Sequence, residues 1–438
     1  MKEHKLTSHF LQLWEQNAQQ LEEQLPLGTL RQTALERFRQ QGFPHKKLEK
    51  WRFSNWMGID NYAWTLNGLD KGTSTYQKPA HPADAYFING EVLLDGEGQA
   101  REMVQLEGGA VRIVTLSYAR AHWPEKFFNY FNRLNGQKES LYGIFPLNTM
   151  FVTRGLWIEV AEGVELSRPL TMVYDVQGVS DGSFLPMRSM WIAGRGSKAE
   201  FLLYERNEPT KHHFIHHVHE LFMAENAEVQ RATLQKYSGK SFIFSAELSA
   251  QLAESHYRRH TSTIGSAALR NELHALLQEP GVHTNLSGLY LVGSTEKVEN
   301  QVFVDHAVPE CESFENFVGI AGGTGRGAFT GHILVRKDAQ KTQAYQSSRN
   351  VVLDDSAWIR TLPFLEIYAD DVKCSHGATV GKLDEDIMFY LRSRGVPDRE
   401  ARKMLLTAFA AETVEIDAEA VRNEFIAEIQ RKLDELLC

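Results

Sequence analysis

A cysteine and a histidine stand one residue apart near the C-terminal end of the chain, in Tyr368-Ala-Asp-Asp-Val-Lys-Cys-Ser-His-Gly-Ala-Thr-Val-Gly381. In an extended segment, alternate residues project from one face, so Cys374 and His376 would lie close enough to share a ligand. Thiolate and imidazole are donors that suit iron and iron–sulfur species. Two donors do not complete a tetrahedral site, so either a second chain supplies the others or the pair binds no metal.

A second group of metal-ligand types is the histidine-rich run Lys211-His-His-Phe-Ile-His-His-Val-His219. A strand would divide these imidazoles between its two faces, with His213, His217 and His219 on one and His212 and His216 on the other. Three imidazoles on one face can hold a divalent ion, but no carboxylate of matching spacing follows. The interpretation we favour is a solvated, histidine-rich strand or turn, and the role of the run stays open.

Two glycine-rich stretches, Gly194–Lys198 and Gly322–Gly327, do not have the spacing of a phosphate-binding loop. A P-loop requires G-x-x-x-x-G-K-[ST], in which backbone amides surround the phosphates and a lysine contacts them. Glycine is favoured where a turn needs positive φ, so both stretches predict turns. We therefore expect no ATP hydrolysis by this chain alone.

The composition is that of an ordinary globular protein. The chain has 438 residues, and 47 Lys and Arg against 56 Asp and Glu give a net charge of −9. This balance disfavours a nucleic-acid-binding role, and there is no apolar run of about 18 residues for membrane insertion. Residues 1–8 lack the apolar core of a signal peptide, and three scattered cysteines do not form a disulfide framework. We expect a cytoplasmic protein.

The region that must position Cys374 and His376 is predicted to consist of strands. From Leu156 to about Tyr368 the sequence alternates in short segments that begin with a small residue and are bounded by Gly, Asn or Asp. Because no helices intervene, three all-β folds are compatible with this pattern: a sandwich, a propeller and a solenoid. Small residues suit tight corners between stacked faces, so we favour a right-handed parallel β-helix with irregular coils.

Helices are predicted on both sides of this β-helix, which makes the fold mainly β with helical flanks. Residues 1–150 are predicted to form an aromatic-rich, mostly helical domain, which also contains a hairpin around Asn89-Gly90. Residues 151–375 are assigned to the β-helix core, and residues 376–438 to a C-terminal helical domain.

Capping residues indicate the boundaries of the C-terminal helices. Asp384 is placed to cap a first helix, which Gly395 ends, and Asp417 is placed to cap the last one. A helix opened by Pro397-Asp398 lies between them, and its apolar residues recur at helical spacing.

Five segments together carry a resemblance to a known family. The stretch Tyr368–Gly381, followed by Phe389-Tyr-Leu-Arg-Ser-Arg-Gly395, resembles the signature of the SufB/SufD family, scaffold subunits of the Suf iron–sulfur cluster assembly system. Ala339-Gln-Lys-Thr-Gln-Ala-Tyr-Gln and Ser348-Arg-Asn-Val-Val-Leu are similar to the last β-helix coils of that family. Lys47-Leu-Glu-Lys-Trp-Arg-Phe resembles its N-terminal helical motif. The Cys-Ser-His-Gly-Ala-Thr string assigns the resemblance to the SufD type.

The resemblance implies a helical N-terminal domain, a right-handed parallel β-helix and a helical C-terminal domain. It implies a non-enzymatic scaffold that works beside a SufB-type paralogue and the ABC ATPase SufC, which alone binds ATP. It also implies that Cys374 and His376 lie at the SufB–SufD interface and contribute ligands to a nascent, transient iron–sulfur cluster, with His376 the stronger candidate. No cofactor is expected to stay tightly bound to the isolated chain. The resemblance also associates a reduced flavin with such complexes, although this sequence contains no recognisable flavin motif.

The same resemblance implies that the C-terminal domain docks SufC. Met404, Leu405 and Phe409 recur on one side of the predicted helix and are the candidate contacts. The alternative is that these three side chains pack the small helical domain itself.

Two functions of other classes stay open. A β-helix carbohydrate-active enzyme would use carboxylates such as Asp354, Asp355, Asp370 and Asp371, although the stretch gives no clear acid–base spacing. A structural homodimer is the other, because the edges of β-helices pair readily and an isolated chain could dimerise through the surface that SufB would occupy.

Overall fold

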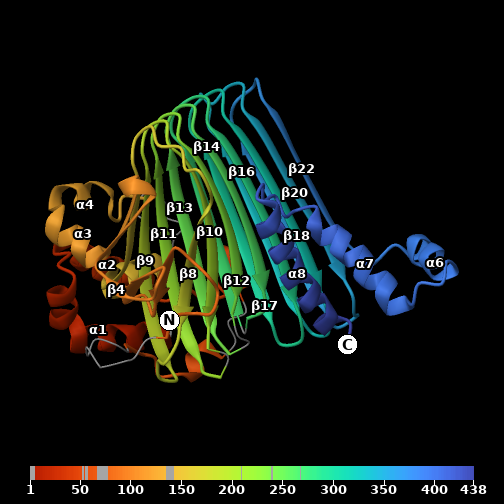
Figure 1. Ribbon diagram of the computed structural model, residues 1–438, viewed down its shortest axis with the longest axis horizontal. Helices are drawn as coiled ribbons and strands as arrows, with labels where there is room; N and C mark the ends of the chain where they lie inside the picture. The colour runs from red at the N-terminus through yellow and green to blue at the C-terminus, as the bar shows by residue number, and fades with distance from the viewer. Residues whose placement is uncertain are drawn as a thin grey trace.

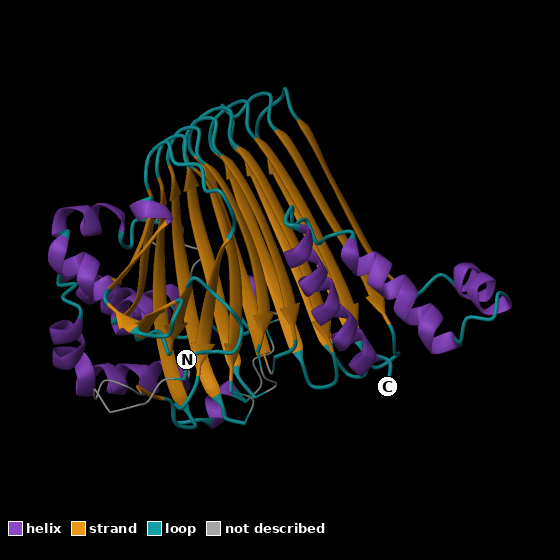
Figure 2. Ribbon diagram, viewed as in Figure 1, coloured by secondary structure: helices purple, strands orange, loops and turns teal. Residues whose placement is uncertain are grey.

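The structure, a computed structural model, describes residues 5–51, 54, 58–66, 77–134, 143–208, 210–237, 240–266 and 268–438. Two long sheets of parallel strands face each other, and helices lie at both ends of the stack (Figure 1, Figure 2). Along the chain, strands from β7 onward fall alternately in the first and the second sheet, so the backbone winds as a β-solenoid. The predicted mainly-β core of stacked coils with helical flanks is confirmed. The hand of the coil stays a prediction.

The first sheet contains the odd-numbered strands from β7 onward, and β5 and β6 continue it at one end. In spatial order they are β5 (Met103–Leu106), β6 (Val111–Thr115), β7 (Arg154–Val160), β9 (Ser183–Ala193), β11 (His213–Met223), β13 (Phe242–Gln251), β15 (Ala268–Leu277), β17 (Lys297–His306), β19 (Arg326–Val335) and β21 (Trp358–Ile367), with β1 (Thr65–Leu66) beside β9.

The second sheet contains the even-numbered strands from β8 onward, and β2, β3 and β4 continue it at one end. In spatial order they are β4 (Ala100–Arg101), β3 (Val92–Asp95), β2 (Ala85–Ile88), β8 (Leu170–Val176), β10 (Lys198–Asn207), β12 (Glu228–Lys236), β14 (His256–Ile264), β16 (His283–Val292), β18 (Glu312–Ala321), β20 (Gln343–Val352) and β22 (Lys373–Gly381).

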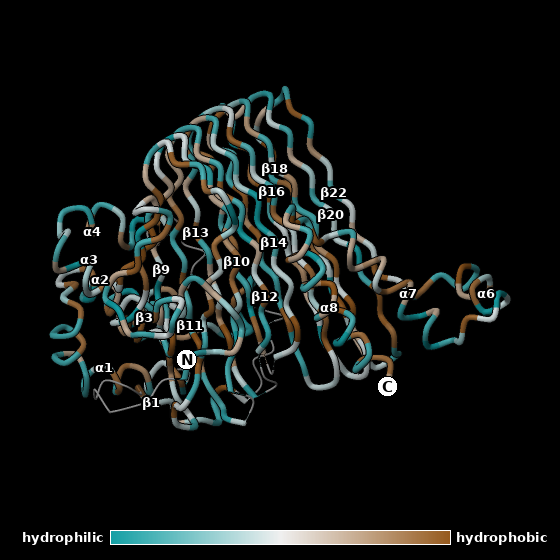
Figure 3. The backbone as a smooth tube through the Cα atoms, viewed as in Figure 1, coloured by the Kyte–Doolittle hydropathy of each residue, from teal (hydrophilic) through white to brown (hydrophobic). Residues whose placement is uncertain are grey.

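The core lies between the two sheets, because alternate residues of each strand point inward. Trp191, Leu203, Tyr257 and Phe317 belong to one continuous buried apolar cluster there. Figure 3 shows polar residues interleaved with apolar ones along the strands. Burial of each large apolar side chain stabilises the stack by about 1.5–3 kcal/mol.

The corners between strands use residues that tolerate positive φ. Gly196 has φ 62°, Asn226 φ 57° and Gly323 φ 59°. Gly196 lies between β9 and β10, and Gly323 lies between β18 and β19. Both glycine-rich stretches are therefore turns, as predicted.

The N-terminal helices cover the first sheet. These helices are α1 (Lys5–Gln24), α2 (Thr29–Gln41), α3 (Leu116–His122), α4 (Pro124–Tyr130) and α5 (Ile144–Phe151). The same region contains three single 3-10 turns, η1 (Glu49–Trp51), η2 (Ile59–Asn61) and η3 (Glu107–Gly109). Phe10, Phe38 and Phe151 pack with Phe184 and Phe214 of the sheet in one buried cluster. Within the Lys47–Phe53 motif, Trp51 is buried and lies 4.0 Å from the guanidinium of Arg270, whereas Arg52 and Phe53 lie outside the described residues.

Strands as well as helices occur before residue 150. β2 and β3 form the hairpin predicted at Asn89-Gly90, where both residues have positive φ, 55° and 68°. The hairpin continues the second sheet through β8, and β5 and β6 continue the first through β7. At the other end of the core, β22 continues to Gly381. The boundary that we placed between residues 375 and 376, where the core was expected to give way to the C-terminal helical domain, therefore falls inside this strand.

Three helices follow β22: α6 (Glu385–Ser393), α7 (Asp398–Ala411) and α8 (Glu419–Leu436). Asp384 accepts hydrogen bonds from the amides of Asp386 and Ile387, as predicted for a cap. The prediction for Asp417 is wrong, because Ala418 takes the capping position and Asp417 pairs with Arg258 at 2.7 Å. No helix among the described residues is long and apolar enough to cross a membrane.

The helices α7 and α8 lie against the second sheet at one side of the stack (Figure 1). Phe425, Ile429 and Leu433 of α8 share a buried cluster with Leu289 and Val318 of the sheet. α7 packs on α8, and α6 projects beyond the end of the solenoid.

Candidate functional site

The solenoid ends in two strands that each have a neighbour on one side only. β21 pairs with β19, and β22 pairs with β20, and both stand last in their sheets. We call β21, Tyr368 and β22 the open end. The outer edges of these strands carry backbone groups that are not used in the sheets of this chain, and such edges accept further strands.

Cys374 and His376 lie on the same face of β22. The register pairs Cys374 with Ala344 and His376 with Gln346 of β20. Ala344 and Gln346 are buried and point between the two sheets. Since neighbouring partners in a sheet point to the same side, the thiol and the imidazole both face the interior side of the last coil, and no further coil among the described residues covers them.

The two side chains differ in exposure. Cys374 is half-buried and packs beside a small apolar cluster that includes Ile333, Val335 and Ala344. His376 is exposed and makes no hydrogen bond or ion pair within the described part of the chain. The imidazole is therefore open to a group that approaches the end of the stack, and the thiol lies deeper beside it.

Burial raises the pKa of the Cys374 thiol above its usual value of 9.0, although a backbone hydrogen bond from Ala344 acts in the opposite direction. The thiol therefore keeps its proton near neutral pH in the isolated chain. The thiolate is the form that binds a metal or attacks an alkylating reagent.

Alkylation of Cys374 in the isolated full chain is expected to rise with pH and to reach half its maximal rate above pH 9, because only the thiolate reacts. The measurement is mass spectrometry of peptides after short iodoacetamide pulses, with the exposed Cys438 as the internal reference. A half-maximal rate for Cys374 below pH 8 would contradict the assigned direction of the pKa.

Large apolar side chains are exposed around this site. Those on the open end are Trp358, Phe364, Ile367, Tyr368 and Val380. Large apolar side chains exposed on the terminal strands of a stack are candidates for contact with another molecule. The sequence did not reveal it, because alternation in a terminal strand looks the same as alternation in a covered one.

The C-terminal helices carry a second exposed apolar group. Of the three predicted contacts, Met404 is exposed, Leu405 is half-buried, and Phe409 is half-buried beneath the Arg349 guanidinium at 5.7 Å. Ile387, Phe389 and Tyr390 of α6 are exposed as well, Phe389 by 75%. The sequence pattern did not identify these residues as a surface.

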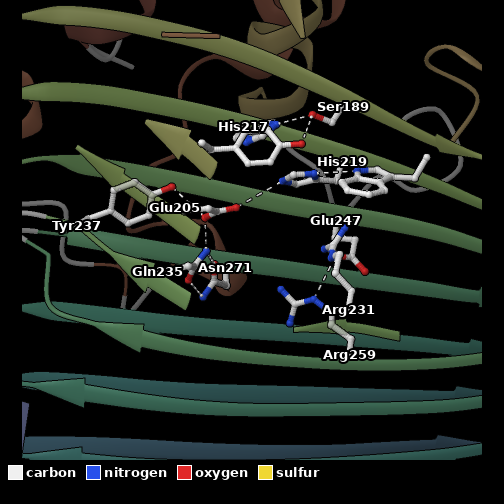
Figure 4. Close-up of polar contacts among 12 residues, drawn as sticks. Ser189, Glu205, His217, His219, Arg231, Gln235, Tyr237, Glu247, Arg259 and Asn271 are labelled. Carbon is white, nitrogen blue, oxygen red and sulfur yellow. Dashed lines mark hydrogen bonds and ion pairs between the residues drawn. The ribbon is translucent and has the colours of Figure 1, made fainter. Parts of the chain in front are cut away.

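The histidine run forms most of β11, and its favoured interpretation as a solvated segment is wrong. His213, His216, His217 and His219 are all buried, because β11 lies in the middle of the first sheet with a layer on each face. His216 packs against Phe244 on the helical side. His217 and His219 point into the solenoid, with ring centroids 3.9 Å apart (Figure 4).

These two imidazoles belong to a hydrogen-bonded network with Glu205 of β10. His217 Nε2 lies 2.9 Å from Ser189 Oγ, and the indole N–H of Trp191 donates to His219 Nδ1 at 3.2 Å. Glu205 accepts hydrogen bonds from Gln235 and Tyr237. One ligand atom from each of Glu205, His217 and His219 lies within 4.8 Å of the others.

The bonding of this network favours neutral imidazoles over a metal site. Burial lowers the pKa of His217 to about 3 and the pKa of His219 well below its usual value. Since Nδ1 of His219 accepts the Trp191 N–H, its proton resides on Nε2, which faces Glu205 at 3.8 Å. A nitrogen that carries a proton cannot coordinate, so these groups satisfy one another as a polar part of the core.

Two carboxylates of the carbohydrate-enzyme alternative, Asp354 and Asp355, make contacts at a corner of the coil. Asp354 accepts a hydrogen bond from the Gly323 amide, and Asp355 pairs with Lys382 at 3.0 Å. These contacts hold the turn between β20 and β21.

Comparison with known proteins gives matches over almost the whole chain. The family described as "SUF system FeS cluster assembly, SufBD core domain" matches residues 176–409, and "SufBD protein N-terminal region" matches residues 4–172. An iron–sulfur cluster assembly SufBD family protein of Synechocystis is 29% identical over 388 residues, which cover 85% of this chain and 83% of the relative.

Two further relatives carry the name iron–sulfur cluster assembly protein SufD. The one from Escherichia coli is 29% identical over 279 residues, covering 63% of this chain and 66% of the relative. The one from Bacillus subtilis is 24% identical over 333 residues, covering 74% of each chain.

Proposed function

This chain belongs to the SufBD family of iron–sulfur cluster assembly proteins, and from that premise we propose that it is a SufD-type scaffold subunit. In this role it supplies ligands for a nascent cluster at an interface with a SufB-type paralogue. The observation that supports the proposal most strongly is the position of Cys374 and His376 on one face of β22, at the open end.

The open end has the features of a partner surface. β21 and β22 offer unpaired edges, and Trp358, Phe364 and Val380 offer apolar area around them. A paralogue with the same solenoid architecture can add its own terminal strands to these edges, so that main-chain hydrogen bonds give affinity. Such an arrangement covers the apolar side chains and encloses Cys374 and His376 between two subunits.

The donor count explains why a second chain is needed. This chain offers one imidazole and one thiol at the open end, and a tetrahedral iron needs more donors. His376 is exposed, whereas half-buried Cys374 must first lose the proton of its thiol, whose pKa is raised by burial. His376 is therefore the first donor of this chain, and Cys374 joins when the metal displaces its proton.

The C-terminal helices supply a second partner surface in this proposal. α8 is anchored on the second sheet by Phe425 and Ile429, while α6 projects with Phe389 and Ile387 exposed. An apolar helix face of this kind docks in a groove of another protein. We assign the SufC-type ATPase to it, together with Met404 on α7, so that movement of the ATPase is transmitted through α8 to the solenoid.

Replacing Phe389 with aspartate is expected to weaken binding of the SufC-type ATPase by about 2 kcal/mol, roughly 30-fold in Kd, because a buried aromatic contact becomes a charge. Binding of the SufB-type paralogue at the open end stays unchanged. The measurement is co-purification of the full chain with both partners, followed by titration of the ATPase.

Asn129→Asp is the matched control, since it adds the same charge at an exposed position of α4, far from α6. A full chain that co-purifies with neither partner would argue against the complex altogether. Unchanged ATPase affinity of Phe389→Asp would remove α6 from the docking surface.

A further inference from the structure

A ladder of interior side chains leads to His376 from inside the solenoid. The register pairs Glu315 of β18 with Gln346 of β20, and Gln346 with His376 of β22. Glu315 and Gln346 are only 2% and 3% exposed. These three side chains therefore occupy the same position in three successive coils and point to the same side.

The amide of Gln346 is held in one orientation. Its Nε2 donates to Glu315 Oε2 at 2.7 Å. Because an amide carries its oxygen and its nitrogen on opposite sides, the carbonyl oxygen is directed away from Glu315. Gln346 Oε1 is buried and accepts no hydrogen bond from any described residue. A buried acceptor without a donor lowers the stability of the fold by about 1–3 kcal/mol. This cost suggests that the carbonyl oxygen of Gln346 has a functional role.

The backbone opposite leaves space for this amide. Gly331 lies in the middle of β19, where glycine weakens a strand unless something approaches closely. A Cβ at Gly331 would meet Gln346 Nε2 at a distance that no side chain tolerates. The glycine therefore allows the glutamine to extend across the core between the two sheets.

Glu315 supports the amide as a neutral acid. Burial raises the pKa of its carboxyl to about 8, so this group keeps its proton at neutral pH. Oε2 then acts as a carbonyl-type acceptor for Gln346, and no net charge is placed in the core beneath the open end.

We propose that Gln346 is a positioning residue for His376: its carbonyl oxygen accepts the N–H of one imidazole nitrogen and so directs the other, unprotonated nitrogen toward iron at the subunit interface. Histidines that bind metals commonly donate their second ring nitrogen to a carbonyl or carboxylate, which fixes tautomer and ring orientation. This inference rests on the ligand role proposed above for His376.

The test is a double-mutant cycle in the complex of the full chain with its SufB-type and SufC-type partners. Gln346→Met keeps the length of the side chain and removes the acceptor. It is expected to lower the rate of cluster formation from iron and sulfide by about 10-fold. In a His376→Ala background the same change is expected to have no further effect, because Gln346 acts through the imidazole.

Gln251→Met is the matched control, since Gln251 is also a buried interior glutamine with an unpartnered carbonyl, but lies on β13, several coils away. It is expected to leave the rate unchanged. Co-elution of the subunits confirms assembly of each variant, and Gln346→Leu replaces the methionine variant if that one does not assemble.

The outcomes separate the inference from the function on which it rests. Suppose that His376→Ala impairs cluster formation. If Gln346→Met then forms cluster at the parent rate, or lowers the rate by the same factor in the parent and in the His376→Ala chain, the positioning role is overturned and the ligand role stands. If His376→Ala forms cluster at the parent rate, the ligand role fails, and the positioning role fails with it.

Discussion

Replacing His376 with alanine is expected to slow cluster formation by at least about 10-fold while the complex still assembles. The imidazole is exposed at the open end, and within the described residues it makes no hydrogen bond or ion pair. Mutation of a residue that only supports a metal ligand typically lowers metal affinity or activity 10- to 100-fold, and loss of a ligand is expected to lower them at least as much.

The measurement is anaerobic reconstitution with iron and sulfide, followed by the growth of visible absorbance, in the complex with SufB-type and SufC-type partners. His122→Ala provides the control, because His122 is also exposed but lies on α3 at the opposite end of the molecule. A normal rate for His376→Ala, or a loss that accompanies failure to assemble, would contradict the ligand role.

A proline at Ala378 is expected to weaken pairing with the SufB-type paralogue roughly 10- to 100-fold. Lys373 donates its amide to Thr342 on the β20 side, and amides alternate in direction along a strand, so the Ala378 amide points to the open edge. Proline removes this donor without breaking the ladder to β20. An unpaired acceptor left on the partner costs about 1–3 kcal/mol.

Ala378→Ser is the matched variant, since it changes the side chain at the same position and keeps the amide. Analytical ultracentrifugation of the full chain with the paralogue gives the two dissociation constants. Equal affinity of the proline and serine variants would show that the subunits do not join through the edge of β22.

Local chemistry made much of the fold predictable. Asn89-Gly90 forms a hairpin because both residues accept positive φ, and Asp384 caps α6 because its carboxylate meets two free amides. Short alternating strands with glycine or asparagine corners predicted the stacked coils. Asp417 had the same capping chemistry, but the nearby Arg258 offered an ion pair instead.

The histidine run shows where such reasoning fails. His217 and His219 were expected in solvent because imidazoles are polar, whereas the solenoid buries them with Ser189, Trp191 and Glu205. These partners come from other strands, so no sequence pattern within the run reveals them. A buried polar residue becomes predictable only when the groups that satisfy it are known.

The candidate site was predictable in part. The spacing of Cys374 and His376 was sufficient to place them on one face of a strand. That this strand is the last of its sheet, with Gln346 beneath the imidazole, follows from register. The exposure of Phe389 depends on how far α6 projects from the core, which is a property of tertiary packing.

The account depends most on direct coordination of the cluster by His376 at the subunit interface. Its most direct test is pulsed electron paramagnetic resonance of the reduced cluster in the complex, with ¹⁵N-histidine incorporated only into this chain. We expect a ¹⁵N coupling typical of a bound imidazole, which disappears in His376→Ala. A cluster that forms in the complex and shows no such coupling, or keeps it in His376→Ala, would contradict the account.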